Sequence, residues 1–116
     1  MVSLKEYENG QSGFTVLYNG QPAGVIEYKD FWKGMPYLSL LKLSPEYRRR
    51  GIGKMAMELF EEAMKKCGNK AVLLSTQSDE EGQFFYRKTG YKECGCLILE
   101  DTPFQQPMEM FFIKTL

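Results

Sequence analysis

The chain alternates short apolar runs with turns rich in glycine and asparagine, and one segment repeats apolar residues at helical spacing. Strand-forming residues fill positions 13–18, and Asn19-Gly20 is a strong hairpin signal that leads into a second strand over 21–28. An aromatic loop is expected at 30–36, followed by a third strand over 37–43 that stops at Ser44-Pro45. The first third of the chain therefore predicts antiparallel strands.

The strongest periodicity runs from Gly51 to Cys67 and predicts one amphipathic helix. Its apolar residues fall at steps of three and four and form one stripe: Ile52, Met55, Ala56, Leu59, Phe60, Ala63, Met64 and Cys67. On the other face, glutamates at 61 and 62 precede lysines at 65 and 66 by four residues, the favourable order for ion pairs. Gly68 is expected to end the helix in a left-handed conformation.

The rest of the chain predicts a buried strand at 71–75, a second helix, and two closing strands near 91–99 and 108–114. Ser78 and Glu81 form a capping-box pattern at the start of that helix, and Gly90 ends it. A strand, helix and strand in succession imply a parallel pair with a right-handed crossover. The predicted fold is α/β (α+β), one mixed and mostly antiparallel sheet, with residues 1–116 forming a single domain.

Charge and composition narrow the class of protein. Fifteen basic residues balance fifteen acidic ones, so neither nucleic acid nor an anionic membrane is an expected partner. Histidine is absent and the cysteines number three, Cys67, Cys94 and Cys96, so no metal site is expected and the thiols are expected to be reduced. Residues 1–8 carry no apolar run. No signal peptide is therefore expected, and the predicted location is cytoplasmic.

The segment from Arg48 to Lys54, Arg-Arg-Arg-Gly-Ile-Gly-Lys, crowds four cations at the start of the long helix. The helix dipole already places partial positive charge there, so each cation costs stability, by about 0.3–1 kcal/mol, unless an anion sits beside it. Gly51 and Gly53 remove side chains and leave backbone N–H groups open to phosphate oxygens. The pattern favours a diphosphate site, and the alternative is that the arginines are merely solvated while the glycines turn the chain.

Two known phosphate motifs fit this segment poorly. The P-loop spacing is absent, since no Gly-Lys-Ser/Thr follows a glycine by four residues. Residues 51–56 match the dinucleotide pattern G-x-G-x-x-A, yet that motif directly follows its strand and opens a mostly parallel sheet. Here seven residues separate Leu43 from Gly51, so this match is weak.

Two signatures resemble those of the GNAT acetyltransferases. Arg48-x-x-Gly51-x-Gly53 is similar to the family's pyrophosphate signature, Gln/Arg-x-x-Gly-x-Gly/Ala, and 41–47 resembles its strand-then-turn lead-in. The segment 85–91, Phe-Tyr-Arg-Lys-Thr-Gly-Tyr, resembles the family's Phe-Tyr-x-x-x-Gly-Phe. The resemblance covers residues 13 to 115 and implies the acyl-CoA N-acyltransferase fold, with its central parallel strands splayed apart for acetyl-coenzyme A.

The resemblance also implies roles for residues. The diphosphate would be held by Arg48, Arg49, Arg50, Gly51, Ile52, Gly53 and Lys54, and the backbone of Leu41, Lys42 and Leu43 would pair with the pantetheine arm like an added strand. Tyr86 stands at the family's general-acid position and would protonate the departing thiolate. Asp79 stands where many relatives have a cofactor-binding asparagine, a departure that puts this contact in doubt and leaves a helix-cap role open.

The prediction of a general base rests on the residue types and not on the resemblance. Because the chain has no histidine, a carboxylate or a water must take the proton of the amine, and Glu27 on the second strand is the candidate. Its alternative role is a solvent-facing strand residue. Tyr37 and Ser39 are further candidates for lining the same cleft.

The function implied is an N-acetyltransferase that moves an acetyl group from acetyl-coenzyme A to a primary amine, either small-molecule or peptide, by direct attack. The alternative is a non-catalytic coenzyme A-binding sensor or interaction module. Relatives usually place two helices between their first strand and the hairpin, and residues 5–10 are too short for them. The uncovered region and a cluster of residues in and around one loop, Tyr28, Phe31, Trp32, Met35 and Tyr37, predict a homodimer. The alternative is a monomer with an open cleft.

Overall fold

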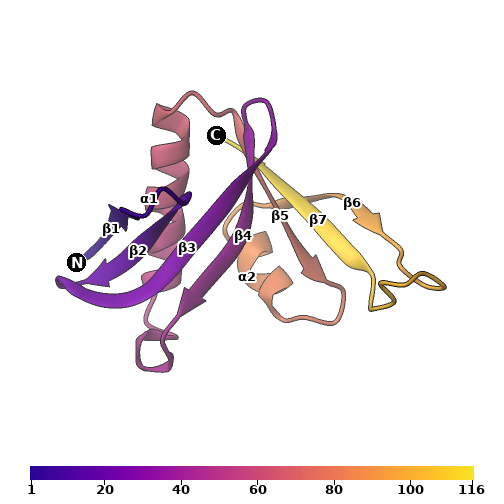
Figure 1. Ribbon diagram of the computed structural model, residues 1–116. Coiled ribbons are helices and arrows are strands. Elements are labelled where there is room, and N and C mark those ends of the chain that lie inside the picture. Colours follow the sequence, from indigo (N-terminus) through magenta and orange to yellow (C-terminus); the bar gives the residue numbers. More distant parts are fainter.

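The computed structural model describes residues 1–116 as a seven-stranded mixed sheet with two α-helices (Figure 1). The strands are β1 (Val2–Glu6), β2 (Gly13–Tyr18), β3 (Gln21–Trp32), β4 (Met35–Leu43), β5 (Ala71–Gln77), β6 (Lys92–Leu97) and β7 (Glu109–Thr115). The helices are α1 (Ile52–Lys66) and α2 (Gly82–Lys88), and a short 3-10 turn, Pro45–Tyr47, precedes α1. The strand order is β1-β2-β3-β4-β5-β7-β6, so the predicted fold class is confirmed.

The first four strands form an antiparallel meander held by tight turns. Asn19 and Gly20 have φ of 51° and 82°, the left-handed pair that a two-residue hairpin needs, as the sequence predicted. The prediction of a loop at 30–36 was wrong, because β3 continues to Trp32 and pairs with Met35 around a second tight turn. The prediction also missed β1, which pairs with β2 throughout its length.

The parallel strands at the centre of the sheet are hardly paired. β4 and β5 are paired at one position, Tyr37 with Leu73, near the start of both strands. Beyond it the two strands diverge, with α2 lying between their far ends (Figure 1). The other neighbouring pairs are joined along five or more positions. The backbone edge of β4 beyond Tyr37 is therefore left without a strand partner, as the predicted splay requires.

One apolar cluster of sixteen buried residues fills the space between the sheet and α1. Phe60 of α1 is fully buried and packs edge-on against Phe14 and at a tilt against Tyr28, with ring centroids 6.3 and 5.5 Å away. Phe85 and Tyr86 of α2 pack against the same cluster. Both helices follow crossovers that move the same way across the sheet, and right-handed crossovers then place them on one face.

The predicted apolar stripe of α1 is partly wrong. Met55 is 46% exposed and Cys67 is exposed, whereas Met57 and Glu61, which the stripe omitted, are buried. The helix has rotated its buried face toward the α2 side of the molecule, where Glu61 finds polar partners. Gly68 has the predicted left-handed φ of 90° just beyond the end of the helix.

The start of α2 also differs from the prediction. The helix begins at Gly82 rather than near Ser78, and no side chain caps it. Glu80, rather than Glu81, turns back to accept a hydrogen bond from the backbone N–H of Gln77 at 2.6 Å. The predicted Ser78–Glu81 capping box is therefore wrong: no side chain caps α2, and the carboxylate of Glu80 closes the turn after β5. Gly90 has φ of 100°, which suits its predicted place after the end of the helix.

Candidate active site

The turn before α1 has the backbone of an anion-binding site. Arg49 and Gly51 have φ of 61° and 78°, and these left-handed residues turn successive peptides toward one side. The N–H groups of residues 49–54 donate to no acceptor in the protein. Six consecutive unpaired amides at a helix start are the donors that a diphosphate needs.

A cavity of about 520 Å³ opens in front of these amides. It lies between the ends of β4 and α2, and its ten lining residues are Leu41, Leu43, Arg48, Arg49, Gly51, Gly53, Lys54, Gly82, Phe85 and Tyr86. We call it the cofactor cavity. Its apolar walls lead from the amides toward the splay between β4 and β5, so it combines a cationic mouth with an apolar slot.

Gly53 keeps this cavity open. A Cβ at this position would lie 3.6 Å from Leu43 and 3.7 Å from Phe85, ordinary contact distances. A small side chain would therefore be tolerated by the fold but would stand between the two walls. The space that the glycine leaves is available to a ligand lying close to the backbone.

The three arginines have different surroundings. Arg48 donates from Nε to the backbone oxygen of Leu43 at 3.0 Å, which fixes the end of β4 against the turn, and with Arg49 it lines the cavity. Arg50 lies elsewhere: its guanidinium stacks 5.0 Å from the ring centre of Tyr18 and 5.9 Å from that of Tyr47. Of the predicted phosphate contacts of Arg50, only the one from its backbone N–H remains possible in this arrangement.

Of the other residues predicted to bind the cofactor, some line the cavity and some do not. Leu41 and Leu43 line it, whereas Lys42 is exposed and Ile52 is 1% exposed in the core, so these two offer only backbone atoms. Asp79 lies exposed in the turn after β5 and does not line the cavity. The sequence reasoning missed Gly82 and Phe85, although Phe85 stood in the quoted Phe-Tyr signature.

Tyr86 lines the cofactor cavity. Burial, reinforced by the charge of Glu80 and by Tyr37, raises its pKa to about 12, so the phenol is protonated at neutral pH. The neighbouring Tyr37 shares a 2.6 Å hydrogen bond with Ser75, which links β4 to β5 beside the single paired position. The site therefore offers a neutral hydroxyl donor where the two strands part.

Glu27 lies apart from Tyr86. It lines a separate hollow of about 360 Å³ together with Ser39, whose hydroxyl donates to the backbone oxygen of Glu27 at 3.1 Å. Its carboxylate accepts a 2.8 Å hydrogen bond from Tyr7. The structure brings Glu27 and Ser39 together, but it does not bring the predicted base and the predicted acid into one cavity.

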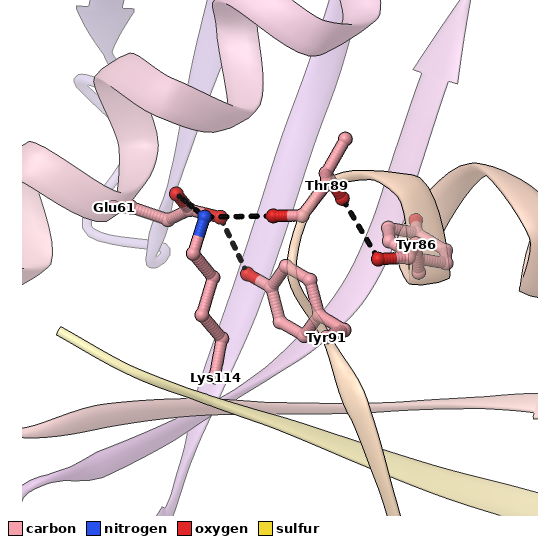
Figure 2. A network of polar contacts seen from close by, with 5 residues as sticks. All are labelled: Glu61, Tyr86, Thr89, Tyr91 and Lys114. Atoms are coloured by element: carbon pink, nitrogen blue, oxygen red, sulfur yellow. Dashed lines mark hydrogen bonds and ion pairs between the residues drawn. The ribbon is translucent and has the colours of Figure 1, made fainter.

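A polar network ties the site to the core (Figure 2). Glu61 of α1 is 8% exposed, and its carboxylate accepts hydrogen bonds from Tyr91 at 2.8 Å and from the ammonium of Lys114 at 2.9 Å. The same ammonium also donates to the backbone oxygen of Thr89. Thr89 in turn donates to the backbone oxygen of Tyr86 at 3.0 Å. The predicted Glu61–Lys65 pair was wrong because Glu61 is turned inward. The exposed Glu62–Lys66 pair is present at 3.3 Å.

Comparison with known proteins identifies the family. The model of the acetyltransferase (GNAT) family matches residues 2–91. The chain belongs to the GNAT family. Comparison with curated proteins gives no significant match.

Solved GNAT structures share the fold. The chain is similar to a GNAT family acetyltransferase from Elizabethkingia anophelis with acetyl-CoA bound, with a TM-score of 0.83, 13% identity, and coverage of 99% of this chain and 98% of that one. It is also similar to a Bacillus anthracis protein in complex with acetyl coenzyme A (TM-score 0.79, 20% identity, 95% and 66% coverage). A third is the PaiA N-acetyltransferase of Thermoplasma acidophilum in complex with coenzyme A (0.69, 28%, 90% and 60%). The chain thus spans about two thirds or less of two of these proteins.

Two further findings bear on other predictions. Neither helix could cross a bilayer, since the longer has 15 residues and carries charged side chains along its length. No three side chains of the histidine, cysteine, aspartate or glutamate type converge as a metal site would need.

Proposed function

We propose that this GNAT protein is an N-acetyltransferase, a single domain that binds acetyl-coenzyme A in the cofactor cavity and transfers the acetyl group to a primary amine. The observation that carries the proposal is the row of six unpaired amides at residues 49–54, opening on a cavity that leads to Tyr86. The diphosphate would accept hydrogen bonds from these amides, with Arg48, Arg49 and Lys54 beside it. The pantetheine arm would lie along the unpaired edge of β4.

In the proposed reaction, the amine nitrogen attacks the thioester carbonyl carbon and the C–S bond then breaks. A backbone N–H of β4 stabilises the oxygen of the tetrahedral intermediate. The hydroxyl of Tyr86 donates a hydrogen bond to the departing sulfur. Because its pKa of about 12 lies above that of an ordinary thiol, about 8.5, hydrogen bonding to the forming thiolate is favoured over complete proton transfer. Tyr86 is thus a donor that stabilises leaving-group charge.

The amine must lose a proton, and Glu27 remains our predicted base. The geometry gives it less support than Tyr86, because it lies in a separate hollow and already accepts a hydrogen bond from Tyr7. Glu27→Gln tests the role. We expect kcat/KM to fall, and a kcat/KM equal to that of the unaltered protein would assign the proton to water.

Binding and turnover are tested separately. Calorimetry with acetyl-coenzyme A should show saturable binding, and ligand at about 100 times its Kd should add roughly 2.7 kcal/mol to the free energy of unfolding. Release of free coenzyme A is then measured over a panel of polyamines, amino acids, aminoglycosides and peptide amines. Binding without turnover on any amine would favour the alternative, a coenzyme A sensor, and no binding at millimolar ligand would contradict both.

A homodimer remains a prediction about the acceptor side. The connection between β1 and β2, residues 7–12, holds no helix, and Phe31 and Trp32 are 54% and 70% exposed at the tip of the β3–β4 hairpin. The other predicted interface aromatics are less available, since Tyr28 packs on Phe60 and Tyr37 bonds to Ser75. Sedimentation equilibrium at micromolar concentration decides it. A monomer mass with coenzyme A bound would favour an open cleft suited to a peptide amine.

A further inference from the structure

A second cavity of about 310 Å³ adjoins the cofactor cavity and shares Lys54 with it. It lies between α1 and the residues that join α2 to β6. From α1 it takes Lys54, Met57, Glu58 and Glu61, whose spacing of three and four puts them on one helix face. From the end of α2 it takes Lys88 with Thr89 and Gly90. The sequence analysis gave separate roles to Lys54 and Glu61 but did not predict a cavity on this face.

The floor of the second cavity is electrically satisfied. Glu61 and Lys114 form an ion pair at 2.9 Å, and both have further hydrogen bonds, to Tyr91 and to the backbone of Thr89 (Figure 2). These two charges cancel, and neither is left without a partner. The charge that a ligand would meet is therefore set by the residues around the mouth.

The mouth of the second cavity is cationic. Lys54 and Lys88 take part in none of the protein's four ion pairs, and Glu58 is the one carboxylate that opposes them there. Two free ammonium groups against one carboxylate leave a net positive charge. Ammonium groups on flexible stems suit a compact anion such as a phosphate monoester.

The position of this mouth matches the chemistry of the proposed ligand. Glu58 lies one turn along α1 from Lys54, a rise of about 5–6 Å from the last of the unpaired amides. Coenzyme A carries a phosphate monoester on its ribose, one sugar away from its diphosphate. We propose that the second cavity takes this 3′-phosphate, with Lys88 and Lys54 as its cationic partners. The inference rests on the proposed binding of acetyl-coenzyme A.

The test compares acetyl-coenzyme A with its 3′-dephospho analogue by calorimetry, on the full chain. The unaltered protein should bind the analogue more weakly, by about 3- to 10-fold, the worth of a partly exposed charge-assisted contact. Lys88→Gln should weaken acetyl-coenzyme A by a similar factor and leave the analogue unchanged. Lys65→Gln, an exposed lysine of α1 that lines neither cavity, removes the same charge and should weaken neither ligand.

The outcomes separate this inference from the function beneath it. Equal binding of the two ligands by the unaltered protein overturns the 3′-phosphate site and leaves the acetyltransferase proposal standing. The site is likewise overturned if Lys88→Gln weakens both ligands equally, or if Lys65→Gln weakens acetyl-coenzyme A as much as Lys88→Gln does. Binding of neither ligand by the unaltered protein contradicts the proposed function itself. Melting temperatures of the two variants within a degree or two of the parent confirm that the loss is local.

Discussion

The start of α1 and the middle of the same helix differ in whether their polar groups have hydrogen-bond partners. At the first turn, the amides of residues 49–54 have no partner, and the backbone is left-handed at Arg49 and Gly51. Two turns further, Glu61 is buried and both carboxylate oxygens accept a hydrogen bond. Unsatisfied donors that face a cavity mark a place where a ligand completes the structure, whereas satisfied ones mark a place where the chain completes itself. Substitutions in the two regions should therefore affect different measurements.

Gly53→Glu attacks the first turn and should have the largest effect. The carboxylate would fill the gap between Leu43 and Phe85 and place a negative charge beside the phosphates, so we expect binding of acetyl-coenzyme A to be lost at millimolar concentration. The melting temperature without ligand should change little, because the added Cβ makes only ordinary contacts with Leu43 and Phe85 and the rest of the side chain extends into the cofactor cavity. Gly53→Ala is the matched control for bulk without charge. Retained micromolar binding by the glutamate variant would show that the diphosphate lies elsewhere.

Tyr86→Phe probes the residue that touches both regions, since it lines the cofactor cavity and packs edge-on against Tyr91 at 5.7 Å. We expect kcat to fall by about 10²–10⁴-fold with little change in coenzyme A affinity, because only the hydroxyl is removed. With a pKa of about 12, the phenol should stay protonated below pH 11 and add no alkaline limb to the kcat profile. An unchanged kcat with chemistry rate-limiting would assign stabilisation of the departing thiolate to water.

Glu61→Gln attacks the middle of α1 and should reverse the pattern. The amide keeps the shape but leaves the Lys114 ammonium, whose side chain is 28% exposed, without its counter-charge. We expect the free energy of unfolding to fall by about 2–3 kcal/mol, measured by urea denaturation. Coenzyme A affinity should not fall, because the uncancelled charge of Lys114 adds to the positive charge of the second cavity. Glu62→Gln, in the exposed pair with Lys66, is the control and should cost less than about 0.5 kcal/mol. Equal losses in the two variants would contradict the structural role of Glu61.

Gly51→Ala has the smallest predicted effect and acts on conformation. Its φ of 78° costs a residue with a Cβ about 1 kcal/mol, although nothing lies within 4 Å of the added methyl. Stability should fall by this amount, and coenzyme A binding should weaken modestly because the turn is less well ordered. A stability unchanged within error would mean that the turn relaxes to another conformation.

The sequence predicted the features that depend on near neighbours. The Asn19-Gly20 turn, the span of α1, and the glycines at 51 and 53 were all set by local pattern, and the structure has them where expected. It failed locally at the expected loop over 30–36 and at the Ser78–Glu81 capping box. The failures around the site involve distant partners. Nothing near Glu61 in sequence tells that Lys114, 53 residues away, will take its charge in place of Lys65. The second cavity was missed for the same reason, since α1 and the end of α2 meet only in the fold.

The single pairing of Tyr37 with Leu73 divides the sheet into two hydrogen-bonded units. One is the β1–β4 meander, built from hairpins between chain neighbours, and the other is β5 with β7 and β6, whose pairing depends on contacts far apart in sequence. Loop-closure entropy makes the second unit slower to assemble, so the meander should form first and serve as its template. In the native protein, amides on either side of the division should exchange with solvent at rates belonging to opening of one unit against the other. A ligand that bridges β4 and β5 would then protect backbone that it never touches.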